Sequence, residues 1–179
     1  MEPTTKIPAK YPVAIRLLHW IMALLIISLL IMGLVMSGME RTDPNRAYLY
    51  NLHKSLGVTV LALAFLRLAI RLRSTLPPLP EMIPVIERKL AALGHLGLYV
   101  FMLAIPLSGI IMTNSYGFAV KWFDVELPRF VGANRDFGHL AGEAHEWLAY
   151  ALIGLLLAHV VGALKHLIKE RINLFKRLM

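Results

Sequence analysis

Two histidines in the last long apolar stretch of the chain are spaced so that they could share one chemical task. His145 and His159 lie fourteen residues apart within the stretch 142–168. On an α-helix fourteen residues make almost four whole turns, so both imidazoles point from the same face, about 21 Å apart along the axis. A bilayer's hydrocarbon core is roughly 30 Å thick. A helix that spans a membrane would therefore present one imidazole near each leaflet, unless both have only structural roles.

Two further histidines lie at matching depths. His19 lies a turn or two inside the first apolar run, and His53 opens the second. With four spans in alternating directions, His19 can meet His159 at one surface, and His53 can meet His145 at the other. Neutral imidazole is a common axial ligand of haem iron, and such sites are built in the cores of helix bundles. The four depths therefore predict two stacked planar metallocofactors, one near each surface.

The composition places these histidines in a membrane protein. Of the 179 residues 58% are hydrophobic, and the mean hydropathy is +0.63, values too high for an ordinary soluble protein. The absence of cysteine excludes protein disulfides, thiolate metal sites and covalent haem attachment. The net charge of +8 does not indicate nucleic-acid binding, because the basic residues lie at the ends of apolar runs.

Four apolar runs are long enough to position the histidines across a bilayer. We expect an all-α integral membrane four-helix bundle that forms one domain over residues 1–179, with spans at about 13–38, 52–72, 88–113 and 142–168. The first run exceeds a signal peptide's apolar region and ends without a cleavage motif, so we expect it to be retained. The loops 39–51 and 114–141 would share one side. The proline-rich link 76–80 excludes helix.

The distribution of charge predicts the orientation. Thirteen of the 19 basic residues, but only four of the 11 acidic ones, fall on the side that holds both termini. The positive-inside rule therefore places both termini in the cytoplasm and both loops in the periplasm. The loop side keeps six basic and seven acidic residues, a balance that does not favour attraction of an anionic substrate.

Several other residues fall on the faces or at the depths of the four histidines. Arg67 and Arg71 share the helical face of His53 at the cytoplasmic level, where they could pair with carboxylates of the inner cofactor or serve only as flanking charges. Gly33 and Gly57 leave room for a flat ring. His95 should lie at the inner depth in the third span, so geometry alone would let it replace His19.

The histidines also lie in short motifs that keep one order along the chain. In chain order these are Arg16-Leu17-Leu18-His19-Trp20, Leu52-His53-Lys54-Ser55-Leu56-Gly57, Arg67-Leu68-Ala69-Ile70-Arg71, Pro77-Pro78, Gly94-His95-Leu96, Pro106-Leu107-Ser108-Gly109, His145-Glu146-Trp147 and His159. With these motifs the chain resembles the bacterial cytochrome b561 family, four-helix inner-membrane cytochromes with two non-covalent b haems. It resembles more distantly the cytochrome b subunits of nickel–iron hydrogenases and formate dehydrogenases.

The resemblance implies a ligand set. His19 and His159 would hold the iron of the inner haem b, and His53 and His145 that of the outer haem b, each iron six-coordinate and suited to electron transfer. His95 and His166 would then contact quinone or haem propionates, or lie at the surface. His139, about a third of a turn off the ligand face, is expected in a loop.

The resemblance also implies a multi-pass protein of the bacterial inner membrane that transfers electrons between an outer-face donor or acceptor and ubiquinone. One form of this function is an enzyme, a superoxide:ubiquinone oxidoreductase. From their positions in the sequence, Lys54, Lys121, Arg129 and Arg135 could form a local positive funnel for it, although such residues more often belong to a solvated loop. The alternative is an electron-carrier subunit for a separate periplasmic redox partner, without catalysis of its own. The expected partners are membrane lipid, quinone and, for the carrier, such a redox protein.

Overall fold

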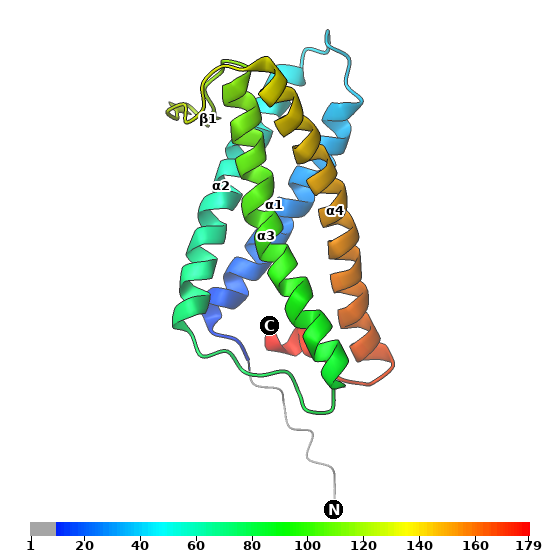
Figure 1. Ribbon diagram of the computed structural model, residues 1–179. Helices are drawn as coiled ribbons and strands as arrows, with labels where there is room; N and C mark the ends of the chain where they lie inside the picture. The colour runs from blue at the N-terminus through cyan, green and yellow to red at the C-terminus, as the bar shows by residue number, and fades with distance from the viewer. Residues whose placement is uncertain (1–9) are drawn as a thin grey trace, which may run out of the picture.

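Four long helices make up most of the protein, and together they form a bundle (Figure 1). The computed structural model describes residues 10–179. The helices are α1 (Val13–Ser37), α2 (Arg46–Arg73), α3 (Val85–Ser115) and α4 (Arg135–Ile168), and each is long and apolar enough to cross a membrane. The predicted all-α four-helix membrane bundle is therefore confirmed.

The helices extend beyond the apolar runs that indicated them. Helix α2 begins at Arg46 and α4 at Arg135, where the sequence predicted spans from 52 and 142. Hydropathy reports only the apolar part of a helix, whereas backbone hydrogen bonding continues into polar residues. At α4 the Asn134 side chain accepts a 3.0 Å hydrogen bond from the Phe137 amide, and Asp136 follows in the first turn. His139 is therefore helical, and the expectation that it lies in a loop was wrong.

Each helix packs on its neighbour in the sequence, α1 on α2, α2 on α3, and α3 most extensively on α4. Within residues 10–179, α1 and α4 do not pack on each other in a comparable way, and neither do α2 and α4. A buried cluster of Met22, Val60, Ala64 and Met102 joins α1, α2 and α3 about halfway along the bundle. Because α4 packs mainly on α3, it faces α1 and α2 across a slot rather than a continuous core.

The outer surfaces of the helices are apolar. Leu24 of α1 is 68% exposed and Leu157 of α4 is 63% exposed, and many other large apolar side chains share this exposure. Apolar side chains on the outside of the bundle suit contact with lipid tails. The helices also pair their own backbone groups, as the hydrocarbon requires.

The segment between α3 and α4 carries a small hairpin made of β1 (Lys121–Trp122) and β2 (Val125–Glu126), paired antiparallel. The hairpin is attached to α2, because the Phe123 amide donates to Ser55 Oγ at 2.8 Å and Trp122 Nε1 donates to Thr59 Oγ1 at 3.0 Å. Its aromatic side chains remain exposed.

The α2–α3 link and the segment after α4 lie at the opposite end of the bundle from the hairpin (Figure 1). The proline-rich link 76–80 is not helical, as predicted. After α4 the chain turns back and forms a short 3-10 helix, η1 (Leu174–Arg177), which packs against α4.

Candidate functional site

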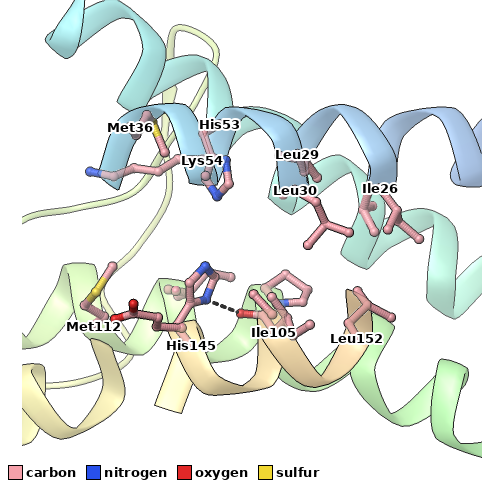
Figure 2. Close-up of a pocket in the computed structure, with 18 of the residues that line it drawn as sticks. Ile26, Leu29, Leu30, Met36, His53, Lys54, Ile105, Met112, His145 and Leu152 are labelled. Carbon is pink, nitrogen blue, oxygen red and sulfur yellow. Dashed lines mark hydrogen bonds between the residues drawn. The ribbon is translucent and has the colours of Figure 1, made fainter. Parts of the chain in front are cut away.

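Two histidines on α2 and α4 form the outer pair, which faces across the slot near the hairpin end of the bundle. The ring centroids of His53 and His145 are 6.2 Å apart, and the ring planes are inclined by 73°. Figure 2 shows the two rings pointing toward each other from opposite walls of the slot. The structure therefore brings together two residues that are far apart in the sequence, across helices that do not pack on each other.

The ring of His145 is held by α3. His145 Nδ1 lies 2.9 Å from the Ile105 carbonyl oxygen and 3.1 Å from Ser108 Oγ. A carbonyl can only accept, so Nδ1 carries the ring proton and the lone pair of Nε2 is free to bind a metal. Gly109 makes this approach possible, because a Cβ atom there would lie 3.2 Å from Cε1 of His145.

A cavity of about 290 Å³ surrounds the outer pair, close to the lower end of the range for small-molecule sites, about 300 Å³. All four helices line it. His53 Nδ1 is buried and has no hydrogen-bond partner among the described residues, which is unusual for a buried polar atom. Gly33 and Gly57, which the sequence predicted to leave room, both line the cavity, and a Cβ at Gly57 would meet nothing within 4 Å.

His19 on α1 and His159 on α4 form the inner pair at the other end of the slot. Their ring centroids are 6.4 Å apart with planes inclined by 56°. The third histidine of this level, His95 of α3, lies closer to His159, with centroids 5.5 Å apart. Its helix packs tightly on α4, since a Cβ at Gly97 would lie 3.1 Å from Cδ2 of Leu155.

Arginines of α2 reach the inner pair. Arg67 Nη2 lies 3.3 Å from His19 Nδ1, and Arg67 Nε donates to the Tyr99 hydroxyl at 3.2 Å. Arg71 lies over the Tyr99 ring, with its guanidinium carbon 5.5 Å from the centroid. Because arginine only donates, His19 Nδ1 accepts in this contact. Sequence reasoning did not include Tyr99, although its position four residues after His95 puts both on one face of α3.

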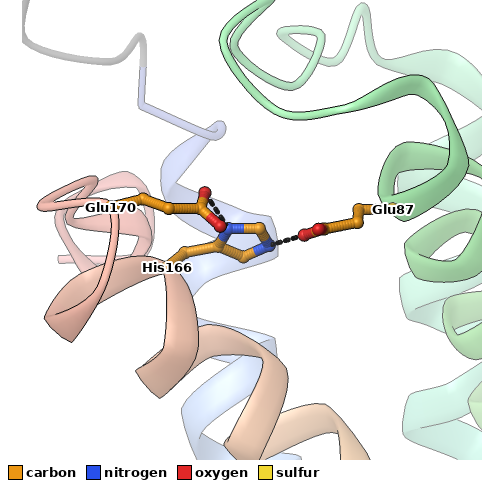
Figure 3. Close-up of side chains that lie close together, drawn as sticks. All are labelled: Glu87, His166 and Glu170. Carbon is orange, nitrogen blue, oxygen red and sulfur yellow. Dashed lines mark hydrogen bonds and ion pairs between the residues drawn. The ribbon is translucent and has the colours of Figure 1, made fainter.

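His166 lies away from both pairs, in a polar cluster where α4 ends. Its Nδ1 is 2.7 Å from Glu170 Oε2 and its Nε2 is 3.6 Å from Glu87 Oε2. Lys165 Nζ bonds both carboxylates, at 2.5 Å to Glu87 and 3.3 Å to Glu170. Figure 3 shows the ring standing between the two acids. These three ligand-type side chains lie close enough for a metal, but the lysine ammonium already supplies the positive charge.

The cluster stabilises the end of α4 in a pH-dependent way. The hydrogen bond from His166, followed by the contact with Lys165, lowers the pKa of the Glu170 carboxyl from its usual 4.5. A carboxyl with a lowered pKa contributes stability that is complete above its unfolded-state pKa and is lost as the pH falls through its folded-state pKa.

We therefore expect Glu170→Gln to lower the thermal midpoint at pH 7 and to have little effect well below pH 4.5, where the native carboxyl becomes protonated. Thermal unfolding in detergent at a series of pH values measures this difference. Glu81→Gln, at an exposed position of the α2–α3 link, is the control. An equal loss of stability at pH 7 and well below pH 4.5 would contradict the prediction.

The charged residues of the hairpin end are spread over different surfaces. Of the four predicted to form a funnel, Lys54 lines the cavity, together with Glu146. Lys121, Arg129 and Arg135 are exposed outside the cavity lining, and Arg129 donates to the Gly117 carbonyl at 3.2 Å. The cavity lining therefore contains one basic and one acidic side chain of these segments.

Comparison with known proteins gives matches along nearly the whole chain. A family model described as prokaryotic cytochrome b561 matches residues 10–179. Cytochrome b561 homolog 2 of Escherichia coli (strain K12) is 32% identical over 180 residues, covering 98% of this chain and 94% of that protein. Cytochrome b561 homolog 1 of the same organism is 30% identical over 168 residues, covering 90% and 92%. A Yersinia pestis protein named "Probable superoxide oxidase CybB" is 31% identical over 170 residues, covering 90% and 91%.

Proposed function

Because the chain belongs to the prokaryotic cytochrome b561 family of membrane electron-transfer proteins, we propose that it binds two b haems and exchanges electrons with ubiquinone. The observation that carries the proposal is the pair of facing imidazoles at each end of the slot, with ring centroids 6.2 and 6.4 Å apart. Ligation by these residues would make the slot a path for electrons between the two membrane surfaces.

The spacing of the rings supports bis-histidine ligation. A bond from a metal to an imidazole nitrogen is about 2.0 Å long and the ring centroid lies roughly 1.1 Å beyond the nitrogen, so two rings on opposite sides of one ion would have centroids about 6.2 Å apart. Both observed separations are close to this value. The Nε2 lone pair of His145, left free because Nδ1 donates to the Ile105 carbonyl, further supports a metal-containing group in the slot.

For the inner haem we propose His19 and His159 as ligands rather than His95 and His159. The first pair lies on helices α1 and α4, which leave a gap. The second lies on α3 and α4, which are in close contact, and its rings are only 5.5 Å apart. When bound, haem supplies a reversible one-electron carrier. The chain's part is to fix the imidazoles and surround them with apolar side chains.

The two arginines are proposed to neutralise propionates of the inner haem. A neutral imidazole that binds iron through Nε2 carries its proton on Nδ1, so His19 could no longer accept from Arg67. The Arg67 guanidinium, 3.3 Å from that nitrogen, would then be released next to the haem edge. Arg71, held over the same Tyr99 ring, would provide a second charge.

Quinone contact is proposed for His95 rather than His166. His95 lies beside His159 at the inner level but, by the argument from packing, is not an iron ligand. His166 has carboxylates near both ring nitrogens, which supports a structural role at the polar surface. Electrons would therefore leave the chain at the inner haem.

The basic flanks of the helices support a location in the bacterial inner membrane with both termini in the cytoplasm. The outer haem would then face the periplasm. The relative named as a probable superoxide oxidase supports superoxide as the electron donor. In that reaction two superoxide ions each lose one electron to give dioxygen, and ubiquinone takes up two electrons and two protons to give ubiquinol. Lys54 and Glu146 both line the cavity, so the lining carries charges of both signs and does not favour an anionic substrate, which supports the second candidate, an electron carrier for a separate periplasmic redox partner.

Rapid mixing of the oxidised, quinone-loaded protein with superoxide tests the proposal, with the haem α band as the signal and superoxide dismutase in the control. Fast, dismutase-sensitive reduction followed by quinone-dependent reoxidation is expected for the enzyme. Two haems that stay oxidised would indicate the carrier. Purified protein without haem, after expression with ample haem supply, would overturn both candidates.

The close approach of Gly109 to His145 leads to a further expectation. In Gly109→Ala the new Cβ would press on the His145 ring at 3.2 Å and loosen its hydrogen bond to Ile105. We expect a loss of outer-haem affinity of about 10-fold or more, because residues that orient a ligand have effects of this size. The haem content after purification measures it. Gly154→Ala on α4, where a Cβ meets nothing within 4 Å, should retain both haems.

A further inference from the structure

We propose that the segment after α4, residues 171–178, is a clasp that holds α1 beside α4 and so positions the ligands of the inner haem. The proposal rests on the proposed function, in which His19 and His159 bind one haem. It assigns a positioning role to Arg177, a residue at the other end of the chain from His19.

The need for a clasp follows from the packing of the bundle. Within the described chain, α1 makes its main helix contacts with α2, and α4 makes its own with α3. The buried cluster that joins α1 to α2 and α3 contains no residue of α4. His19 lies on α1 and His159 on α4, two helices that do not pack extensively on each other. A change in the distance between these helices would therefore change the distance between the two rings. Direct packing of α1 on α4 therefore does not fix that distance, and a further contact between the ends of the two helices would help to hold it.

The clasp starts where α4 ends. Arg171 has a left-handed backbone with φ of 56°, and the Ile172 amide donates to the His166 carbonyl at 2.9 Å, so the chain turns back toward the bundle. The Asn173 side chain then accepts from the Lys176 amide at 3.3 Å and caps η1. Figure 1 shows this red segment between the end of α4 and the start of α1, level with the lower turns of α3.

Two backbone groups of the clasp bond to α1 and to the residues just before it. The Arg177 carbonyl accepts from the Tyr11 amide, and the Leu178 carbonyl accepts from Trp20 Nε1, both at 3.0 Å. Trp20 is the neighbour of His19, and the two rings are in edge contact with centroids 5.1 Å apart. The clasp therefore reaches an inner ligand through a single side chain.

Arg177 anchors the clasp to the rest of the inner end. Its side chain is only 2% exposed. Nη2 donates to the Pro77 carbonyl at 2.5 Å and to the Pro78 carbonyl at 2.9 Å, and the guanidinium carbon lies 4.9 Å from the centroid of the Tyr11 ring. A buried charge is costly unless its hydrogen bonds are satisfied. The proline-rich link provides carbonyls that no helix uses, so one side chain joins this link, the clasp and the start of α1.

The arrangement has a specific consequence for the inner haem. Loss of the Arg177 contacts would free the start of α1 and, through Trp20, the ring of His19, while His53 and His145 at the other end would keep their surroundings. The protein should therefore bind the inner haem less tightly, or the redox potential of the inner haem should change, whereas the outer haem should be unaffected. A general loss of folding would affect both haems.

The test is Arg177→Ala in the full-length protein, with haem content, redox titration and the low-spin electron paramagnetic resonance signals of both haems as readouts. We expect inner-haem affinity to fall about 10- to 100-fold, the range for residues that orient a metal ligand, or the inner potential to shift, with the outer haem unchanged. Arg177→Lys, which retains a donor and the charge, should recover part of the inner signal. Lys176→Ala, at an exposed position of η1, is the matched control.

Trp20→Phe provides a second test that does not remove the buried charge. It deletes only the Nε1 donor to Leu178 and keeps an aromatic ring beside His19, so it should shift the inner potential alone. If Arg177→Ala loses both haems, Trp20→Phe decides. Unchanged inner haem in Arg177→Ala or in Trp20→Phe, with two haems in the wild type, would overturn the clasp alone. A wild type without a haem ligated by His19 and His159 would overturn the proposed function as well.

Discussion

Replacement of His145 by alanine is expected to leave the protein with one haem instead of two. His145 faces His53 across the slot with the spacing of two axial ligands, and a non-covalent haem that loses one of its two iron bonds is poorly retained. Only the outer haem should be lost, because the inner pair is almost four helical turns away on α4. Haem content per chain and the number of low-spin resonance signals measure the change.

His53→Ala should remove the same haem, since both residues would hold one iron. His139→Ala is the matched control on α4, because His139 is exposed and does not line the cavity. Among the described residues its one ion-pair partner is Glu143, 3.6 Å away. Two haems remaining in His145→Ala would contradict the assignment. A variant without any haem would show instead that the two sites depend on each other.

The second large effect is expected for the inner level, where three histidines compete for two places. His19→Ala should lose the inner haem, whereas His95→Ala should keep both haems. The reason is space. His95 and His159 lie on helices so close that a Cβ at Gly97 would touch Leu155, and a porphyrin does not fit between helices in such contact. Spectra of the two variants, together with the redox potentials of the remaining haems, give the measurement.

In this comparison each variant is the control for the other, since both remove a buried imidazole from the inner end. The assignment fails if His95→Ala loses the inner haem while His19→Ala keeps two. His95→Ala should instead change the reoxidation of the reduced haems by quinone, because His95 lies beside the inner pair without binding iron in this proposal. Unchanged reoxidation would remove His95 from the quinone site.

The sequence allowed much of the fold and part of the site to be predicted. The four apolar runs gave the helices, and the fourteen-residue spacing of His145 and His159 gave two levels, because both follow from repeats within one helix. The bounds of α2 and α4 were less well predicted, since a helix continues after its apolar part ends. For the same reason His139 was wrongly expected in a loop.

Contacts between distant segments were not predictable in this way. No periodicity links Glu87 to Lys165 and His166, or Arg177 to the carbonyls of Pro77 and Pro78. The Ile105 carbonyl that orients His145 is a backbone group, and its sequence position says nothing about this role. These contacts depend on how helices pack and on the path of segments without regular structure.

The sequence by itself therefore determined that the chain is a four-helix membrane protein with histidines at two depths, because hydropathy and helical spacing are local properties of the chain. Only the tertiary structure decided which rings face each other, and that α1 and α4 leave a gap where α3 and α4 do not. The physical reason is that distances between helices are set by side-chain packing and by a few buried contacts. Arg177 provides such contacts, and its partners lie about 100 or more residues away in the chain.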